Sequence, residues 1–152
     1  MRNKDYIVHN EKEIKGFDGD YDFLSNFFVA GVYFEGLWYQ SSENAYQAAK
    51  TLDEYKRRKF SYISPSQSKK DGKKLELRAD WDKVKIDVMS VIVFEKFYRN
   101  RELRKKLLET GDRYLEETNW WGDNFWGVCN GEGRNELGKI LMKVRNFWKN
   151  GE

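Results

Sequence analysis

The sequence predicts an α+β fold, a helix-dominated single domain with a small antiparallel sheet. Three observations lead to this prediction. Apolar residues recur at helical spacing over 82–100. Aromatic and β-branched residues alternate around two glycines over 29–39, which is typical of a short hairpin. The 152 residues contain one proline and no linker-like stretch, so we expect one domain over 1–152, with 1–16 as a lead-in segment.

The first half of the chain is expected to begin with a short strand at Tyr6–Val8 and a turn-rich stretch. The hairpin follows, and Ser41 or Ser42 is then the expected N-cap of a helix that ends near Leu52, because serine side chains accept hydrogen bonds from the first turn. A second helix is predicted over 53–62, before Pro65.

The rest of the chain is predicted to contain four further helices. A lysine-rich segment, 66–77, forms a helix interrupted near Gly72. The long helix over 82–100 comes next, and a shorter one over 102–109 ends at a glycine. A strand at 114–118 and a loop with four glycines and three tryptophans then lead to a last helix over 135–148.

Composition excludes several classes of protein. Charged residues make up 35% of the chain and mean hydropathy is −0.89. No apolar run is long enough to span a bilayer, and the start of the chain lacks the basic-then-apolar order of a secretory signal. We therefore expect a cytoplasmic protein with no membrane partner.

The chain holds one cysteine, Cys129, and one histidine, His9. A disulfide framework, a histidine-centred triad and a transition-metal site are therefore not expected. The predicted site contains no metal and no cofactor, although magnesium held by carboxylates and a substrate phosphate stays an alternative. Chemistry must come from carboxylates, lysines and polar groups.

The segment Ser42–Lys50 contains the first candidate site. On a helix, Glu43, Tyr46, Gln47 and Lys50 fall at i, i+3, i+4 and i+7 and share one face. Glu43 and Lys50 are about 10 Å apart along the axis, too far for an easy ion pair but suited to the two ends of a groove. The alternative is a solvated helix face with an acid favoured by the helix dipole.

Two glycine-rich segments are further candidates. Asp123 and Trp126 lie in an aromatic loop, where glycines allow a ligand to approach the backbone. The alternative is a tight turn that caps the core. At 131–138, backbone N–H groups before a helix can cradle a phosphate, or the segment is an ordinary helix entry.

Two aromatic segments complete the set. In Phe23–Phe28, Phe23 and Phe27 are expected in the core, while Asn26 either forms a turn or binds a ligand edge. Before the long helix, Trp81 is either a hydrophobic staple or a stacking face for a base. Asp80 or Asp82 is the expected N-cap of that helix.

The order of these motifs resembles the NADAR (YbiA-like) family over about residues 17–148. Phe23–Phe27, Ser42–Lys50 and Arg78–Trp81 match the first part of the family pattern. The remaining matching residues are Lys96-Phe97, Leu107-Leu108, Thr110-Gly111, Asp123, Trp126-Gly127, Gly133, Asn135, Leu137-Gly138, Leu141-Met142 and Arg145. The chain departs from the bacterial pattern at Val128–Asn130, which leaves the exact substrate open.

The resemblance implies an N-glycosidase that splits the bond between a base or amino-pyrimidine nitrogen and a phosphorylated ribose or ADP-ribose. Its substrates are then early riboflavin-pathway intermediates or ADP-ribosylated guanine, including ADP-ribosylated nucleic acid. The implied catalytic residues are Glu43, Asp123 and Lys50. The resemblance implies Trp81 as a substrate-binding residue. The candidate segments add Asn26, Tyr46, Arg78, Trp126, Gly133 and Asn135, of which Arg78, Gly133 and Asn135 are candidates for holding phosphate.

The chemistry suits these residues. Departure of an N-linked base leaves an oxocarbenium-like sugar, which needs a nearby carboxylate, a base for water and a proton for the nitrogen. Lys50 is either a nucleophile that forms a Schiff base or an ammonium anchor for phosphate.

Two other classes of function stay open at the level of sequence. One is a non-catalytic module that captures ADP-ribose or a nucleotide. The other is a nucleic-acid binding protein that uses the basic run Lys69–Lys74, which is otherwise a solvated helix surface. The net charge of +3 argues against a general nucleic-acid coat.

Overall fold

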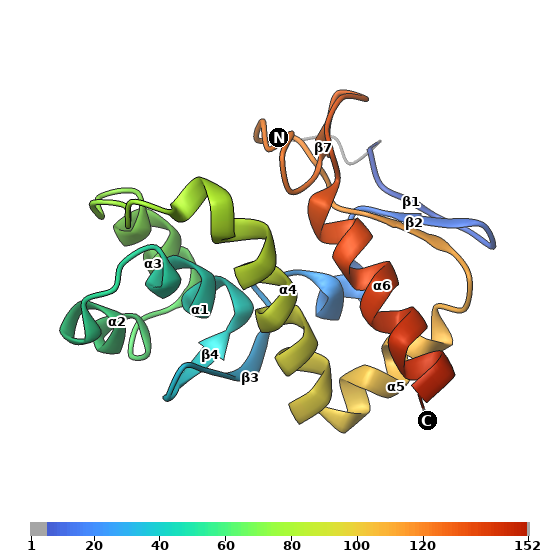
Figure 1. Ribbon diagram of the computed structural model, residues 1–152. Helices are drawn as coiled ribbons and strands as arrows, with labels where there is room; N and C mark the ends of the chain where they lie inside the picture. Colours follow the sequence, from blue (N-terminus) through green and yellow to red (C-terminus); the bar gives the residue numbers. More distant parts are fainter. Residues whose placement is uncertain (1–5, 152) are drawn as a thin grey trace. The chain divides into compact units, whose positions relative to one another are not determined.

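A computed structural model describes residues 6–151 of the chain (Figure 1). These residues form two compact units, one made of 6–25 with 102–151 and the other of 26–101. Helices and three small sheets make up the fold, with five helices in succession over residues 42–109 and strands before and after them, so the predicted α+β class is confirmed.

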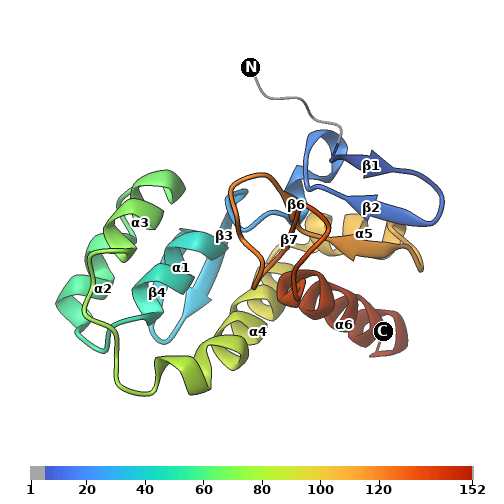
Figure 2. The ribbon, with the colours of Figure 1, turned by 90° about the horizontal axis from the view of Figure 1, so that it is seen from above.

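The unit of residues 26–101 joins a hairpin to four helices (Figure 2). Glu35 and Gly36 form the hairpin turn with φ values of 45° and 94°, the positive values that a tight two-residue hairpin turn requires. The hairpin strands pair in antiparallel fashion, and α4 packs against β3. The elements are β3 (Val29–Phe34), β4 (Leu37–Ser41), α1 (Ser42–Ala49), α2 (Glu54–Phe60), α3 (Pro65–Gly72) and α4 (Trp81–Arg99).

Capping residues set the helix starts in this unit. Ser41, Asp53 and Ser64 each accept a hydrogen bond from a backbone N–H in the first turn of α1, α2 and α3. Asp80 precedes α4 without such a side-chain bond. Pro65 occupies the first position of α3, where its missing N–H costs nothing.

The other unit carries a mixed three-stranded sheet and two helices. Its sheet has the order β1-β2-β5, and β2 pairs with β5 in parallel across about a hundred residues of chain. The strands β6 and β7 also pair in parallel. The elements are β1 (Val8–His9), β2 (Glu13–Lys15), η1 (Gly19–Leu24), α5 (Arg101–Glu109), β5 (Tyr114–Glu116), β6 (Thr118–Asn119), β7 (Val128–Cys129) and α6 (Glu136–Gly151).

The predicted helices match closely except for one that ends early, whereas the strands differ in two ways. The expected antiparallel pairing holds for β3–β4 and β1–β2, but two other pairings are parallel. The predicted strand at 114–118 is split into two, and the helix expected over 66–77 ends at Gly72. The lead-in contains β1 and β2, and its first five residues lie outside the described part of the chain.

Aromatic and aliphatic side chains fill the core of each unit. Phe23 is buried as expected, but Phe27 is 39% exposed, so its predicted core position is wrong. It follows the buried Asn26 at the start of its unit, where the chain turns before β3. Within residues 6–151, no helix combines the length and apolar character needed to cross a membrane.

Candidate active site

Helix α1 is buried on every side, although half of its residues are polar. All eight residues from Ser42 to Ala49 are buried. Asn44 accounts for part of this, because its Nδ2 donates to the carbonyl oxygens of Phe60 and Ile63 at 2.8 and 2.9 Å. The interpretation of α1 as a solvated face is therefore wrong, since α2, α3, α4 and the hairpin all pack around it.

Glu43 is the most enclosed of the predicted catalytic groups, with 7% of its surface exposed. Its Oε2 accepts a hydrogen bond from Gln47 Nε2 at 2.6 Å, one helical turn further along. Its backbone N–H donates to the carbonyl oxygen of Asn26 at 2.9 Å. The side chain of Gln47 thus orients the Glu43 carboxylate on α1.

Gly72 of α3 explains why Gln47 is fixed. A Cβ atom at Gly72 would lie 1.9 Å from Gln47 Oε1 and 2.6 Å from Gln47 Cδ. Only glycine allows α3 to approach α1 this closely. Gln47 Oε1 is buried without a hydrogen-bond partner, so the contact holds the amide in a costly position. The i, i+4 spacing from Glu43 and the family motif were the sequence signals for Gln47, and Gly72 gave none beyond a helix interruption.

Lys50 follows the last turn of α1, with its ammonium 5.5 Å from the centre of the Tyr46 ring. Burial lowers the pKa of Lys50 below its ordinary value, and the positive charges of Lys73, Lys69 and Lys85 lower it further. The carboxylate of Glu43 acts in the opposite direction. A lysine in this environment gives up its proton more readily than an exposed lysine.

Three more predicted binding residues lie in this unit, and each makes contacts inside the protein. Trp81 is 5% exposed, and its ring centre is 5.2 Å from that of Tyr46. Arg78 binds both carboxylate oxygens of Asp80, at 2.6 and 3.1 Å, and this hydrogen bonding raises the pKa of Arg78. Asn26 Nδ2 lies 3.5 Å from the sulfur of Met89. Their roles toward a substrate stay predictions.

Asp123 lies in the loop of the other unit, where it organises the backbone. Its Oδ1 accepts from the N–H groups of Phe125 and Trp126 at 3.1 and 2.9 Å. Asn119, which is 2% exposed, binds the backbone N–H and C=O of Asp123 through its side-chain amide. Asn119 was not among the predicted residues, and its position at the edge of a loop gave no signal.

The glycine-rich segment 131–138 packs closely against the backbone of Gly127 and Val128. Gly133 has a φ of 152°, and a Cβ there would lie 2.2 Å from the carbonyl oxygen of Gly127. Asn135 Oδ1 accepts from the backbone N–H of Glu117 at 3.0 Å, and its Nδ2 donates to the carbonyl oxygen of Leu115 at 2.9 Å. These contacts fix the entry to α6, and phosphate binding by this segment stays a prediction.

The predicted residues therefore fall into two groups, one in each compact unit. Glu43, Lys50, Tyr46, Trp81, Arg78 and Asn26 belong to the unit of residues 26–101. Asp123, Trp126, Gly133 and Asn135 belong to the other. Within residues 6–151, no cluster of three or more His, Cys, Asp or Glu side chains is arranged to hold a metal ion.

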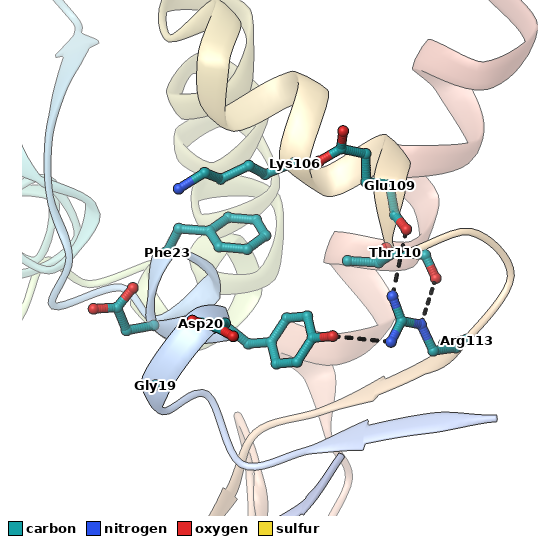
Figure 3. Close-up of a pocket in the computed structure, with 9 residues that line it drawn as sticks. Gly19, Asp20, Phe23, Lys106, Glu109, Thr110 and Arg113 are labelled. Atoms are coloured by element: carbon teal, nitrogen blue, oxygen red, sulfur yellow. Dashed lines mark hydrogen bonds between the residues drawn. The ribbon is translucent and has the colours of Figure 1, made fainter. Parts of the chain in front are cut away.

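A hollow of about 440 Å³ lies between η1 and the end of α5 (Figure 3). Arg113 closes one side, and its guanidinium donates to Tyr21 Oη at 2.9 Å and to the carbonyl oxygens of Thr110 and Glu109 at 2.9 and 3.3 Å. None of the predicted site residues lines this hollow. Because the donors of Arg113 already serve the protein, we assign the arginine a structural role.

Comparison with known proteins gives one consistent family. The model of the NADAR domain matches residues 11–148. An N-glycosidase of Nostoc punctiforme is 34% identical over 137 residues, which cover 86% of this chain and 87% of the relative. A riboflavin biosynthesis protein of Vibrio vulnificus is 38% identical over 133 residues, but this chain spans only 36% of its length.

A solved structure agrees with these sequences. The NMR structure of the Escherichia coli protein YbiA superposes with a TM-score of 0.81 at 32% identity, covering 96% of this chain and 90% of that one. The N-glycosidase YbiA of Escherichia coli is 35% identical over 130 residues, or 83% of this chain and 81% of the relative. Sequence motifs, family model and fold agree, and the chain belongs to the NADAR family.

Proposed function

We propose that this protein is an N-glycosidase that hydrolyses the bond between a base-like nitrogen and the anomeric carbon of a phosphorylated ribose. The N-glycosidases among its relatives match it over most of their length and support the reaction class. The observation that carries the proposal for this chain is the buried Glu43 carboxylate, held by Gln47 on the same helix as Lys50.

The reaction needs groups of this kind. As the bond from the anomeric carbon to nitrogen breaks, its electron pair leaves with the nitrogen and positive charge develops on the sugar. Glu43 stabilises this charge and accepts a proton from the attacking water. Asp123 is the candidate that delivers a proton to the departing nitrogen, as the family resemblance implies.

Lys50 offers a second route for the same bond cleavage. With a lowered pKa, its amine can attack C1 of the ring-opened sugar and expel the base nitrogen as a free amine, which leaves a Schiff base on Lys50. Water then hydrolyses this Schiff base to release the sugar and restore the lysine amine. Borohydride added during turnover separates the routes. A reduced sugar adduct on Lys50, found by peptide mass spectrometry, supports the covalent route. Without an adduct, and with activity kept in Lys50→Arg, Lys50 is an electrostatic anchor.

The candidate substrates share a ribose that carries phosphate. One class is the phosphoribosyl amino-pyrimidines of early riboflavin synthesis, which the name of the Vibrio relative favours. The other is ADP-ribose attached to guanine, free or in nucleic acid. We expect this protein to act in the cytoplasm.

A substrate panel tests the proposal. The purified protein is incubated with a phosphoribosyl amino-pyrimidine, NAD, ADP-ribosyl guanosine and ADP-ribosylated DNA, and products are identified by mass spectrometry. We expect release of ribose 5-phosphate or ADP-ribose by the wild type, and not by Glu43→Gln. Tight binding of ADP-ribose without turnover of any substrate would replace this function with that of a binding module.

A further inference from the structure

Helix α3 presents its lysines on different sides. Ser68 and Gly72 are buried and face α1, against which α3 packs (Figure 2). Lys69 and Lys73 each follow one of these residues, so they are turned about 100° from the buried stripe and share one flank of the helix. Lys70 is turned about 200° from Ser68 and points away from α1.

Lys69, on this flank, lies beside the segment that binds the backbone of Glu43. The ammonium of Lys69 is 5.6 Å from the centre of the Phe27 ring. Phe27 directly follows Asn26, whose carbonyl oxygen binds the backbone N–H of Glu43. The pKa of Lys50 responds to Lys73, Lys69 and Lys85 as nearby positive charges. Asp71 on the opposite flank, with Lys74 and Leu75 beyond the end of α3, lines a separate apolar hollow.

Positive charge is therefore concentrated beside the buried carboxylate. Lys69, Lys73 and Lys85 each act on Lys50 as a nearby positive charge, and Lys85 lies 3.6 Å from the carboxylate of Asp82. Lys73 is exposed and forms no ion pair with any described residue. Positive charges held close together repel one another, and a bound anion lowers this repulsion. A phosphate group is the anion that the proposed substrates carry.

We propose that Lys69 of α3 and Lys73, the C-cap of that helix, bind the phosphate of the substrate and select phosphorylated ribosides over unphosphorylated ones. The inference rests on the proposed function for the position of the sugar near Glu43. It assigns the same chemistry to a ribose 5-phosphate group and to the diphosphate of ADP-ribose. Lysine binds either one as a point charge.

Direct binding tests the inference without turnover. Ribose 5-phosphate, ADP-ribose and ribose are titrated calorimetrically into the full chain. We expect Lys69→Ala and Lys73→Ala each to weaken binding of a phosphorylated ligand about tenfold or more, the effect of losing one charge-assisted hydrogen bond. Affinity for ribose should not change. Lys70→Ala, on the same helix but turned away from α1, is the matched control and should bind like the wild type.

The ligand more strongly affected by the two variants identifies which phosphate is bound. Far-UV circular dichroism and the melting temperature confirm that each variant is folded, and Lys73→Ala changes an exposed side chain. A second readout compares kcat/KM for a phosphoribosyl substrate and for its dephosphorylated form. We expect the wild type to prefer the phosphorylated form at least tenfold, and Lys69→Ala with Lys73→Ala to remove that preference through KM.

The outcomes separate the two proposals. If no N-riboside is cleaved but ribose 5-phosphate binding depends on Lys73, the proposed function fails and this inference stands. If turnover occurs but Lys69→Ala and Lys73→Ala match the wild type and Lys70→Ala, the inference is overturned and the function stands. Absence of any phosphate-dependent binding or rate in the wild type also overturns it.

Discussion

Helix α1 and the loop that follows β6 each carry one candidate carboxylate, but they hold it differently. Glu43 is attached to a fully buried helix, and its carboxylate accepts from the Gln47 side chain. Asp123 uses Oδ1 to fix its own loop through two backbone N–H groups. The helix therefore presents a carboxylate that its backbone does not require, whereas the loop depends on its carboxylate for its shape.

Because of this difference, a substitution separates the functional role of the acid from its structural role more readily on α1 than in the loop. On α1, the acid can be neutralised without loss of a backbone contact. In the loop, any change that removes the acceptor also releases Phe125 and Trp126. Two residues proposed for one reaction therefore need different variants to test them.

The largest effect is expected for Glu43→Gln. The substitution keeps the size of the side chain and removes its charge and its capacity to accept a proton, so we expect kcat to fall about 10²–10⁴-fold. The melting temperature should stay near that of the wild type, because an amide can still accept from Gln47 through its oxygen. A folded variant with unchanged kcat would remove Glu43 from the reaction.

Asp123 needs a pair of variants because of its two tasks. Asp123→Asn retains an oxygen acceptor for the two N–H groups, while Asp123→Ala removes it. If Asp123 also transfers a proton, Asp123→Asn lowers kcat about 10²-fold with an unchanged melting temperature. We expect Asp123→Ala to lower stability as well, by about 1 kcal/mol, as for loss of a capping group. Full activity in Asp123→Asn would leave the residue a purely structural role.

The contrast between helix and loop also shows what the sequence could predict. Helices were predicted well because their signals are local, such as the capping residues Ser41 and Asp53. The parallel pairing of β2 with β5 was missed, because it depends on residues about a hundred positions apart. Burial of α1 was missed for a related reason: its polar side chains are satisfied by partners from other elements, as Asn44 is by Phe60 and Ile63.

The site could be predicted only in part, and for the same reason. Motif order identified Glu43, Lys50 and Asp123, which remain candidates on chemical grounds. The close contact between Gln47 and Gly72 could not be predicted, since it depends on how α3 packs against α1. Long-range packing thus determines which residue orients the acid, while local sequence supplies the acid itself.

A smaller effect is expected when the residue that orients Glu43 is changed. Gln47→Met keeps the length of the side chain but removes its donor, so we expect kcat to fall about tenfold. The acid limb of the kcat profile should move to higher pH, because a hydrogen bond that favours the charged carboxylate is lost. Gln67→Met is the matched control: Gln67 also bonds a carboxylate four residues away, Asp71 at 2.8 Å, but on an exposed surface.

In that control we expect no change in kcat and no shift of the profile. If both variants lose the same activity, the effect belongs to helix stability and not to the orientation of Glu43. A profile that keeps its acid limb in Gln47→Met, despite a lower kcat, would show that Gln47 only supports packing.

The smallest effect is expected on folding stability, which the partly buried ammonium of Lys50 lowers. Burial, followed by the charges of Lys73, Lys69 and Lys85, lowers the pKa of Lys50 in the folded protein, so the folded state binds this proton more weakly than the unfolded chain. Stability therefore rises with pH between the lowered folded pKa and the unfolded value of about 10.4. Below that window, the charged ammonium lowers stability by its full amount.

Lys50→Met removes the charge at every pH and retains an unbranched side chain. At pH 7 we expect its melting temperature to exceed that of the wild type by roughly 2–4 °C, the shift that about 1 kcal/mol produces in a chain of this length. The difference should shrink as the pH approaches 10, because the wild type then loses the same charge. Lys70→Met, at an exposed position, should melt with the wild type at both pH values. If Lys50→Met instead melts lower at pH 7 and the loss disappears at pH 10, attraction to Glu43 outweighs burial, and the ammonium is a stabilising partner of the acid.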